Sequence, residues 1–209
     1  MSILGKAVCS MLRLSMIGFK RSWHITRYSM YRSLQQTGTD LLKHEGDVLS
    51  ISQSKIICDV MGFKPINFVE ADYPAVNILS MPYHDNSFDF VCSDQVLEHV
   101  SGNPQQAINE CWRVLRPGGI AVHTSCFINP LHNEPGDYWR FTPDALCLLS
   151  HPFKKIISYG AWGNFHALLL IRSGMRFDRV PRASWHPFNI IASKNDPIWP
   201  IVTWIVAEK

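Results

Sequence analysis

The sequence has no uninterrupted apolar run of about 18 residues, the length that a membrane-spanning helix needs. Its six cysteines form no Cys-x-x-Cys motif, and no Cys/His pair has the spacing of a zinc finger. Internal repeats and low-complexity tracts are also missing. These absences argue against membrane-embedded, zinc-finger and repeat proteins. The 209 residues suffice for one globular domain with a sizeable core.

Net charge is also low, but it is unevenly spread. The chain carries +3, whereas residues 1–43 hold seven basic side chains and one acid, so the remainder carries −3. We therefore divide the chain into a basic N-terminal helical arm (residues 1–44) and an α/β domain (residues 45–209). Residues 1–22 mix large apolar and basic residues, which predicts a weakly amphipathic helix lying on a membrane surface or on the domain. An ordinary solvated basic face is an equal alternative.

Cysteine usage bears on the compartment. Cys58, Cys92, Cys111 and Cys126 lie in apolar runs and are interpreted as small core residues, which fits a reducing cytoplasm. Basic residues interrupt the N-terminal apolar residues, so no secretory signal is expected. We expect a cytoplasmic protein that contacts a membrane peripherally through its basic N-terminus.

Apolar runs and breakers predict alternating strands and helices, which is typical of a parallel sheet covered on both faces. Strands are expected at 47–51, 66–71, 88–93, 120–124, 153–159 and 201–207; helices at 24–44, 55–61, from Pro104 to the turn at Pro117-Gly118-Gly119, and from a Thr142 cap.

The connection after the second predicted domain strand is unusually short. Only four residues separate Asp72 from Asn77, whereas neighbouring parallel strands need a crossover of roughly a dozen. Residues 75–79 should therefore be an extended connection. We predict a Rossmann-like three-layer α/β sandwich with a mostly parallel sheet, trimmed at the third-strand edge.

The middle of the chain has a recognisable order of motifs. Met81-Pro82 precedes an apolar strand, Leu97-Glu98-His99-Val100 follows it, and Leu115-Arg116-Pro117-Gly118-Gly119 comes after the next helix. This order resembles class I S-adenosylmethionine-dependent methyltransferases of the type 11 family. The resemblance implies S-adenosylmethionine as cofactor and methyl transfer to an acceptor.

The family's first cofactor motif is an acid followed by a Gly-x-Gly turn. In this chain Ser50 stands at the position of the acid, and Ser52 and Ser54 stand at the positions of the glycines. Serine adopts positive φ less readily than glycine, and the missing acid removes a partner for the cofactor's ammonium group. Weak cofactor binding, or none, is therefore an alternative.

Further cofactor contacts are expected at the carboxyl ends of the next strands, where ligands bind in open α/β sheets. Asp72, with Glu70 as the alternative, suits the ribose hydroxyls, because a carboxylate accepts two hydrogen bonds. Asn77 and Ile78 match the positions that approach adenine. Asp94 and Gln95 either contact the cofactor or cap the following turn. The residues expected to bind the cofactor are thus Ser50, Ser52, Ser54, Glu70, Asp72, Asn77, Ile78, Asp94 and Gln95.

The acceptor side is expected in the polar segment after the strand at 120–124. His132 is the candidate general base, Asp137 could orient it or bind the acceptor, and Arg140 could bind an anionic acceptor. A structural ion pair between Asp137 and Arg140 is the alternative. The sequence His132-x-x-Pro135-x-Asp137-Tyr138 and onward resembles type 11 methyltransferases of poorly defined substrate, often associated with glycans.

The sequence thus predicts a methyltransferase that acts on a small acceptor, glycan-linked or lipid-linked, without a metal. A catalytically inactive relative that serves as a binding or regulatory protein is the alternative, because of the serine turn and the short connection. A nucleic-acid partner is not expected, because the basic residues follow no known reader motif.

Overall fold

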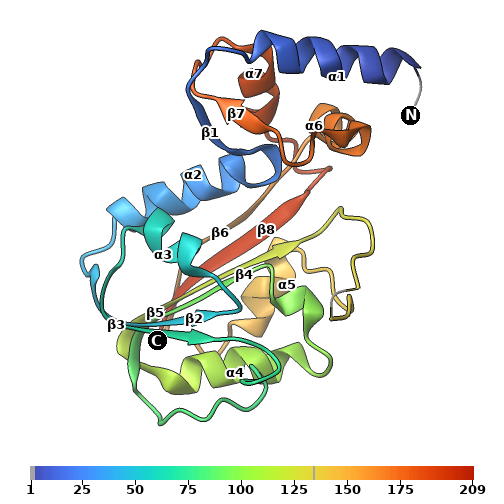
Figure 1. Ribbon diagram of the computed structural model, residues 1–209. Coiled ribbons are helices and arrows are strands. Elements are labelled where there is room, and N and C mark those ends of the chain that lie inside the picture. Colours follow the sequence, from blue (N-terminus) through green and yellow to red (C-terminus); the bar gives the residue numbers. More distant parts are fainter. Residues whose placement is uncertain (1–2, 134) are drawn as a thin grey trace.

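The computed structural model describes residues 3–133 and 135–209 (Figure 1). A six-stranded sheet forms its centre, in the order β3-β2-β4-β5-β8-β6. The first four strands run parallel, and β8 is antiparallel to both of its neighbours. The strands are β2 (Glu45–Ile51), β3 (Lys64–Ala71), β4 (Phe88–Asp94), β5 (Leu115–Cys126), β6 (Lys155–Trp162) and β8 (Val202–Glu208). The predicted mostly parallel α/β fold is confirmed.

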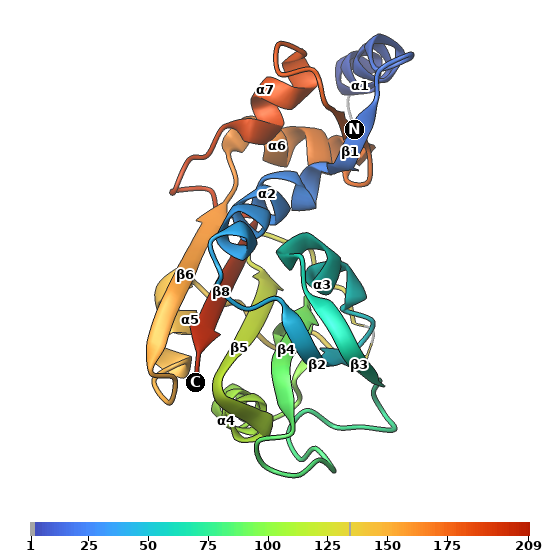
Figure 2. The ribbon, with the colours of Figure 1, turned by 90° about the vertical axis from the view of Figure 1, so that its left-hand side faces the viewer.

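Helices cover both faces of this sheet, as Figure 2 shows. Alternate residues along each strand supply the two apolar layers: Val48 joins the core under one face and Leu49 the core under the other. One face carries α2 (Ile25–Thr39) and α3 (Lys55–Met61); the opposite face carries α4 (Pro104–Val114) and α5 (Pro143–Leu149). The three predicted layers are present.

The third-strand edge is trimmed, as predicted. The extended connection predicted at residues 75–79 is wrong: the chain forms turns there, because the N–H of Val76 bonds to the carbonyl of Asp72 and the N–H of Ser80 to the carbonyl of Asn77, with a single isolated bridge between Asn77 and Ser80. β3 is consequently an edge strand of the sheet.

The end of α4 differs from the prediction. The helix stops at Val114, and β5 already begins at Leu115, which pairs with Phe88. Pro117-Gly118-Gly119 therefore lies within the strand instead of ending the helix. Gly118 donates its N–H to the carbonyl of Lys209, and the N–H of Lys209 donates to the carbonyl of Gly119, so the C-terminus pairs with this segment. Gly118 has a φ of 77°, and the register of the β4–β5 pairing shifts between Phe88 and Phe90.

A second group of elements lies beyond one end of the sheet, at the top of Figure 1. We call it the cap lobe and define it as residues 3–24 and 165–199. It contains α1 (Ile3–Ser15), β1 (Arg21–His24), α6 (Phe165–Leu170), the π-turn η2 (Ile171–Met175), β7 (Arg179–Pro181) and α7 (Pro187–Ser193). Strands β1 and β7 pair antiparallel, so segments from both ends of the chain build the lobe together. The helix within residues 1–22 was predicted, whereas β1 and β7 were not.

Residues 25–39 do not stand apart from the α/β domain. Ile25, Met30 and Leu34 of α2 are fully buried in the same core as Val48 of β2 and Phe90 of β4. The helix is thus an outer layer of the sandwich. Among the described residues, no helix is long and apolar enough to cross a membrane.

Candidate active site

A pocket of about 510 Å³ opens where the parallel strands β2 and β4 end, which is where ligands bind in open α/β sheets. Its volume falls within the range of small-molecule and cofactor sites, roughly 300–1,000 Å³. Four of the residues predicted to bind cofactor line it: Ser52, Asn77, Ile78 and Gln95. The structure brings these four together from three separate segments of the chain.

The serine turn forms the edge of this pocket. Ser52 and Gln53 both adopt left-handed backbone angles, with φ of 53° and 62°. Glu70 supports the turn, because its Oε1 accepts a bond from the N–H of Gln53 at 2.7 Å and another from the hydroxyl of Ser50 at 3.1 Å. The carboxylate on β3 therefore holds the chain in the conformation that glycines would adopt freely.

Ser54 lies inside the protein and does not line the pocket. Its buried hydroxyl donates to the carbonyl of Ile51 at 2.5 Å and accepts from the N–H of Asp94 at 2.6 Å. The hydroxyl thus ties the end of β2 to the end of β4. Ser50 is equally buried.

Asp94 faces α2. Its carboxylate accepts bonds from the hydroxyls of Tyr31 and Thr124, both at 2.5 Å, and lies 3.7 Å from the guanidinium of Arg27. Burial and the charge of Asp94 raise the pKa of Tyr31 far above its usual range, so this hydroxyl keeps its proton. Asp94 therefore anchors α2 to the sheet below the pocket.

The short connection after β3 forms another wall. Asp72 is exposed and does not line the pocket, although its neighbour Tyr73 does. Asn77 turns its own side-chain oxygen back to the N–H of Leu79 at 2.9 Å, while Ile78 adds apolar surface. The amide nitrogen of Asn77 remains for a ligand.

Gln95 and His99 come from the segment after β4. Gln95 has φ of 59°, and its side-chain amide donates to the hydroxyl of Thr124 at 3.0 Å. His99, in the 3-10 turn η1 (Leu97–His99), lines the pocket and bonds through Nδ1 to the carbonyl of Gly136. His99 was not among the site residues predicted from the sequence. Its position just beyond a strand's carboxyl end was the available signal.

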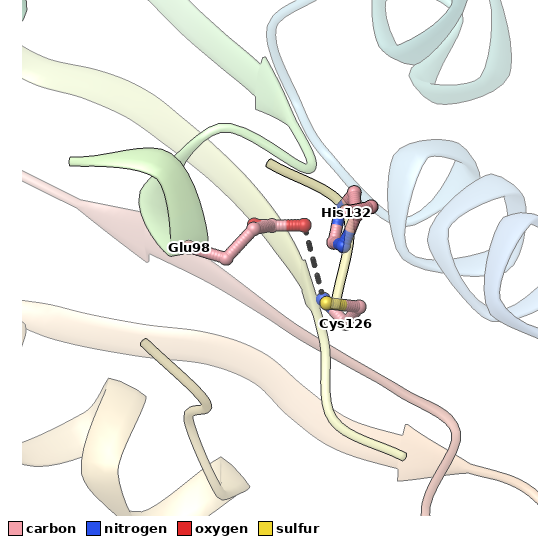
Figure 3. Close-up of side chains that lie close together, drawn as sticks. All are labelled: Glu98, Cys126 and His132. Atoms are coloured by element: carbon pink, nitrogen blue, oxygen red, sulfur yellow. Dashed lines mark hydrogen bonds between the residues drawn. The ribbon is translucent and has the colours of Figure 1, made fainter. Parts of the chain in front are cut away.

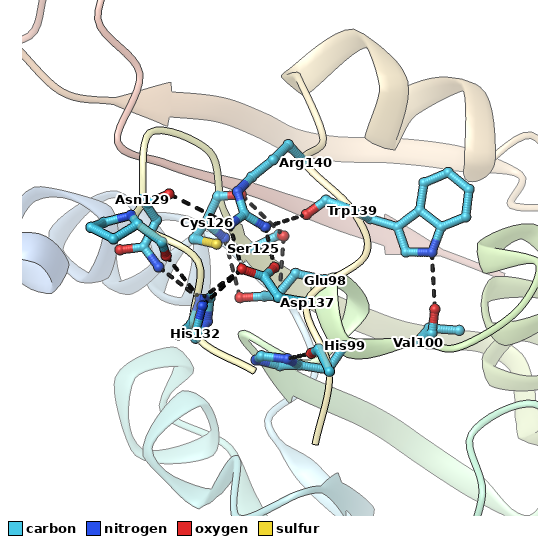
Figure 4. Close-up of polar contacts among 12 residues, drawn as sticks. Glu98, His99, Val100, Ser125, Cys126, Asn129, His132, Asp137, Trp139 and Arg140 are labelled. Atoms are coloured by element: carbon cyan, nitrogen blue, oxygen red, sulfur yellow. Dashed lines mark hydrogen bonds and ion pairs between the residues drawn. The ribbon is translucent and has the colours of Figure 1, made fainter. Parts of the chain in front are cut away.

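The polar segment after β5 folds over η1, as Figure 4 shows. The carbonyl of Glu98 accepts from the N–H groups of Tyr138 and Trp139, and the indole of Trp139 donates to the carbonyl of Val100 at 2.9 Å. These bonds fix the loop beside the pocket.

His132, Asp137 and Arg140 form the charged centre of this loop (Figure 4). The carboxylate of Asp137 is fully buried and receives two bonds from the guanidinium of Arg140, one of them at 2.6 Å. Those bonds hold the pKa of Asp137 far below its usual range in spite of burial. The predicted ion pair exists, and it occupies the guanidinium that was expected to bind an acceptor.

His132 lies beside this pair. Its Nδ1 is 3.1 Å from Asp137 Oδ2, 3.3 Å from the carbonyl of Pro130 and 3.0 Å from the amide nitrogen of Asn129. Two of these three neighbours are acceptors and one of them is charged, so they favour a proton on Nδ1 and leave Nε2 to accept one. The His132 ring also packs edge-on against His99, with centroids 4.7 Å apart.

Glu98 and Cys126 lie beside His132, with Glu98 to its left and Cys126 below it in Figure 3. One ligand atom of each lies within 4.8 Å of the others, so this trio could hold a metal ion, and it is the one such group among the described residues. The Glu98 carboxylate accepts from the hydroxyl of Ser125 at 3.0 Å and from the N–H of Cys126 at 3.4 Å. Burial and the charge of Glu98 raise the pKa of the Cys126 thiol to about 12, so the sulfur is protonated at neutral pH. Sequence reasoning had placed Cys126 in the core and had not singled out Glu98.

A second pocket of about 450 Å³ lies between this loop and the cap lobe. Tyr138 lines both pockets, so they meet at its ring. The second pocket is also lined by the apolar residues Phe127, Ile128, Pro130, Leu131, Leu168 and Ile171 and by the polar residues Asn129, Asp137, Arg140 and Arg172. His132 lines neither pocket, but it contacts His99 of the first pocket and Asp137 of the second.

Comparisons with known proteins fit this geometry. Residues 30–123 match the family described as a methyltransferase domain. These residues contain β2, β4 and the first part of β5, with the pocket-forming turns between them. This part of the chain is thus similar to an S-adenosylmethionine-dependent methyltransferase domain. Family and fold imply S-adenosylmethionine as the cofactor.

A probable S-adenosylmethionine-dependent methyltransferase from Mycolicibacterium smegmatis is 44% identical over 57 residues, which are 25% of this chain and 22% of that protein. The ubiquinone/menaquinone biosynthesis C-methyltransferase of Roseobacter denitrificans is 32% identical over 74 residues, 34% of this chain and 29% of that enzyme. The chain thus spans less than a third of the length of these two curated relatives.

Solved structures share the fold across nearly the whole chain. A methyltransferase from Thermotoga maritima, described as a possible histamine N-methyltransferase, superposes with a TM-score of 0.50 at 15% identity, covering 88% of this chain and 91% of its own. At this identity the likeness shows the fold alone.

The first pocket fits the cofactor of the methyltransferase family in shape and in part of its chemistry. Ile78, Val76 and Leu79 offer apolar faces for a purine, and Gln95 and Asn77 offer amide groups. None of the described residues that line it carries a carboxylate. A bound cofactor would therefore find no carboxylate for its ammonium group among these lining residues, as expected because Ser50 stands at the position of the family's acid.

Proposed function

We propose that this protein transfers a methyl group from S-adenosylmethionine in the first pocket to an acceptor in the second. The observation that supports this proposal is the junction of the two pockets at Tyr138, at the carboxyl ends of the parallel strands. When bound, the cofactor supplies an electrophilic methyl carbon. Methyl transfer then chiefly requires that the acceptor nucleophile be held in line with that carbon.

His132 is the proposed general base for an acceptor hydroxyl or ammonium. Its Nε2 accepts the proton, while the Asp137 carboxylate beside Nδ1 stabilises the imidazolium that results. Arg140 acts as a positioning residue, since both of its bonds to Asp137 fix the carboxylate. Ser52, Asn77, Ile78 and Gln95 are the proposed cofactor contacts, with Asp72 or the free oxygen of Glu70 for the ribose.

The lining of the second pocket supports an amphipathic acceptor, such as a lipid-linked or glycan-linked small molecule. Phe127, Leu168 and Ile171 provide apolar surface, and Arg172 provides positive charge at the same wall. An anionic head joined to an apolar chain would satisfy both.

Calorimetric titration with S-adenosylmethionine tests the cofactor part. We expect saturable heat, and we expect Gln95→Ala to weaken binding several-fold, because its amide faces the pocket. Gln35→Ala, an exposed substitution on α2, is the matched control and should leave the affinity unchanged. Absence of heat at millimolar cofactor would contradict the proposal.

Label transfer tests the chemistry. The protein is incubated with methyl-tritiated cofactor and a cell extract, and label is counted separately in the lipid-soluble and the polar fractions. We expect label in one fraction and its loss with His132→Gln. Cofactor binding without transfer to either fraction would instead support the alternative, a catalytically inactive binding or regulatory protein.

A further inference from the structure

Large apolar side chains lie on the outer face of α1, within the part of this helix whose side chains the structure describes. Val8, Met11 and Leu14 recur at three-residue spacing on the side away from the protein, with Met11 70% and Leu14 65% exposed. Ile17 and Trp185, each 67% exposed, extend this surface beyond the end of the helix. We call these five residues the α1 patch. Contiguous exposed apolar surface of this kind marks an interaction site.

The inner face of α1 is firmly seated, so the helix presents the patch in a fixed direction. Cys9 and Met16 are buried, and the Cys9 thiol bonds to the carbonyl of Ser173 at 3.4 Å. The Arg13 guanidinium spans Asp178 at 2.8 Å and the carbonyl of Gly174 at 2.7 Å. Figure 1 shows α1 as the outermost element of the cap lobe.

The lobe beneath the patch is strongly cationic. Its sequence contains nine basic and two acidic residues, a formal charge of +7; because the whole chain carries +3, everything outside the lobe carries −4. Three exposed cations stand close to the end of α1: Lys20 and Arg21 follow it, and the N–H of Arg182 bonds to the carbonyl of Lys20 at 2.8 Å. Both the apolar side chains and the excess charge thus lie at one end of the molecule.

We infer that the α1 patch docks onto an anionic lipid bilayer. An apolar helix face that buries itself at the headgroup boundary, flanked by Lys and Arg that attract anionic lipid, is the pattern of an interfacial helix. A second copy of this chain fits less well, since two lobes of +7 would repel each other. Nucleic acid would satisfy the cations but leave Met11 and Leu14 in water.

Docking would place the second pocket near the bilayer. The turn η2 packs directly under α1 through Ser173 and Gly174, and Ile171 and Arg172 of the same turn line that pocket. One turn of chain therefore separates the lipid-facing helix from the proposed acceptor space. The docking itself does not depend on the proposed methyl transfer.

Vesicle co-sedimentation of the full chain tests the inference, with vesicles of phosphatidylcholine alone and of phosphatidylcholine mixed with phosphatidylglycerol. We expect sedimentation with the mixed vesicles and its decline with added salt. The double variant Met11→Glu/Leu14→Glu should partition at least ~10-fold more weakly, because two buried apolar contacts are exchanged for charge. Point variants are preferable to removal of residues 1–22, which would delete half of the β1 pairing.

Leu42→Glu/Leu148→Glu is the matched control: it places the same charges at two exposed leucines outside the lobe and should sediment like the wild type. Lys20→Glu/Arg182→Glu should weaken binding to the mixed vesicles alone. Failure of the wild type to sediment, or equal sedimentation of the patch variant, would overturn the inference. The inference would also be overturned if light scattering detected a dimer of the wild type that is absent in the patch variant. Binding to a DNA probe without binding to vesicles would overturn it as well.

Discussion

The two sides of the active site, the serine turn after β2 and the charged loop after β5, are stabilised in opposite ways. The serine turn is held by neutral hydroxyls and one carboxylate, with its strained residues at the pocket edge. The loop is held by a buried ion pair whose charges satisfy each other. The turn has departed from the family's residues and kept its shape through hydrogen bonds. The loop stabilises the residues proposed for chemistry, so its charges serve structure and function together.

The largest effect is expected at the loop. Asp137→Ala leaves the Arg140 guanidinium without its partner beside a buried site, and breaking such a pair typically costs about 3 kcal/mol or more of unfolding free energy. Urea denaturation measures the loss. Asp144→Ala, at an exposed position in the first turn of α5, is the control and should change stability by about 0.5 kcal/mol at most. Equal losses in both variants would remove the distinction between loop and surface.

The serine turn allows a matched pair of substitutions with opposite signs. Ser54→Gly removes a buried hydroxyl that bonds to Ile51 and Asp94, and should cost about 2 kcal/mol. Ser52→Gly relieves a left-handed backbone and should add about 0.5–1 kcal/mol. Both are measured by the same denaturation experiment. Two losses of similar size would show that the turn is not strained.

Tyr31→Phe tests whether Asp94 lies outside the cofactor site. It removes one of the two hydroxyl bonds to the carboxylate and should lower the unfolding free energy by about 1 kcal/mol. Because Asp94 faces α2 and not the pocket, cofactor affinity in calorimetry should stay within about twofold. A large loss of cofactor affinity would indicate that Asp94 contributes to cofactor binding.

A modest effect that depends on pH is expected at the opposite end of the sheet. Burial opposes ionisation of Asp89, but Lys43 at 2.6 Å, the N–H of Asp47 and Arg116 together lower its pKa. Asp89 therefore contributes stability above the unfolded pKa of about 3.9, and that contribution is lost as pH falls through the lower folded pKa. Because both cations are substantially exposed, we expect Asp89→Asn to remove about 1 kcal/mol at pH 7. The cost should shrink in unfolding measurements made in acid, and a constant cost across pH would contradict this.

Most of the sheet could be predicted because its strands are continuous apolar runs bounded by breakers. The run at 88–93 and the helix at 55–61 are examples that local sequence alone specifies. The β1–β7 pair could not be predicted, since each strand is very short and its partner lies about 155 residues away in the sequence. The early end of α4 was not predicted either, because the pairing of Gly118 and Gly119 with the C-terminal Lys209 cannot be seen in the local sequence.

For the site, strand ends indicated the correct neighbourhood but not the direction of each side chain. Ser52 and Gln95 reach the pocket, whereas Ser54 and Asp94, one to two residues away in the sequence, turn to each other and to α2. Glu98 and Cys126 were missed because their proximity arises only when η1 packs against β5.

The pairing of β1 with β7 has a consequence for synthesis. Arg21 emerges from the ribosome long before Pro181, its partner in the ladder, exists. During translation α1 therefore lacks the Ser173 and Asp178 contacts that seat it, and its apolar residues have no fold to pack against. α1 is thus synthesised well before the segments that anchor it, and its apolar side chains stay uncovered until the cap lobe closes.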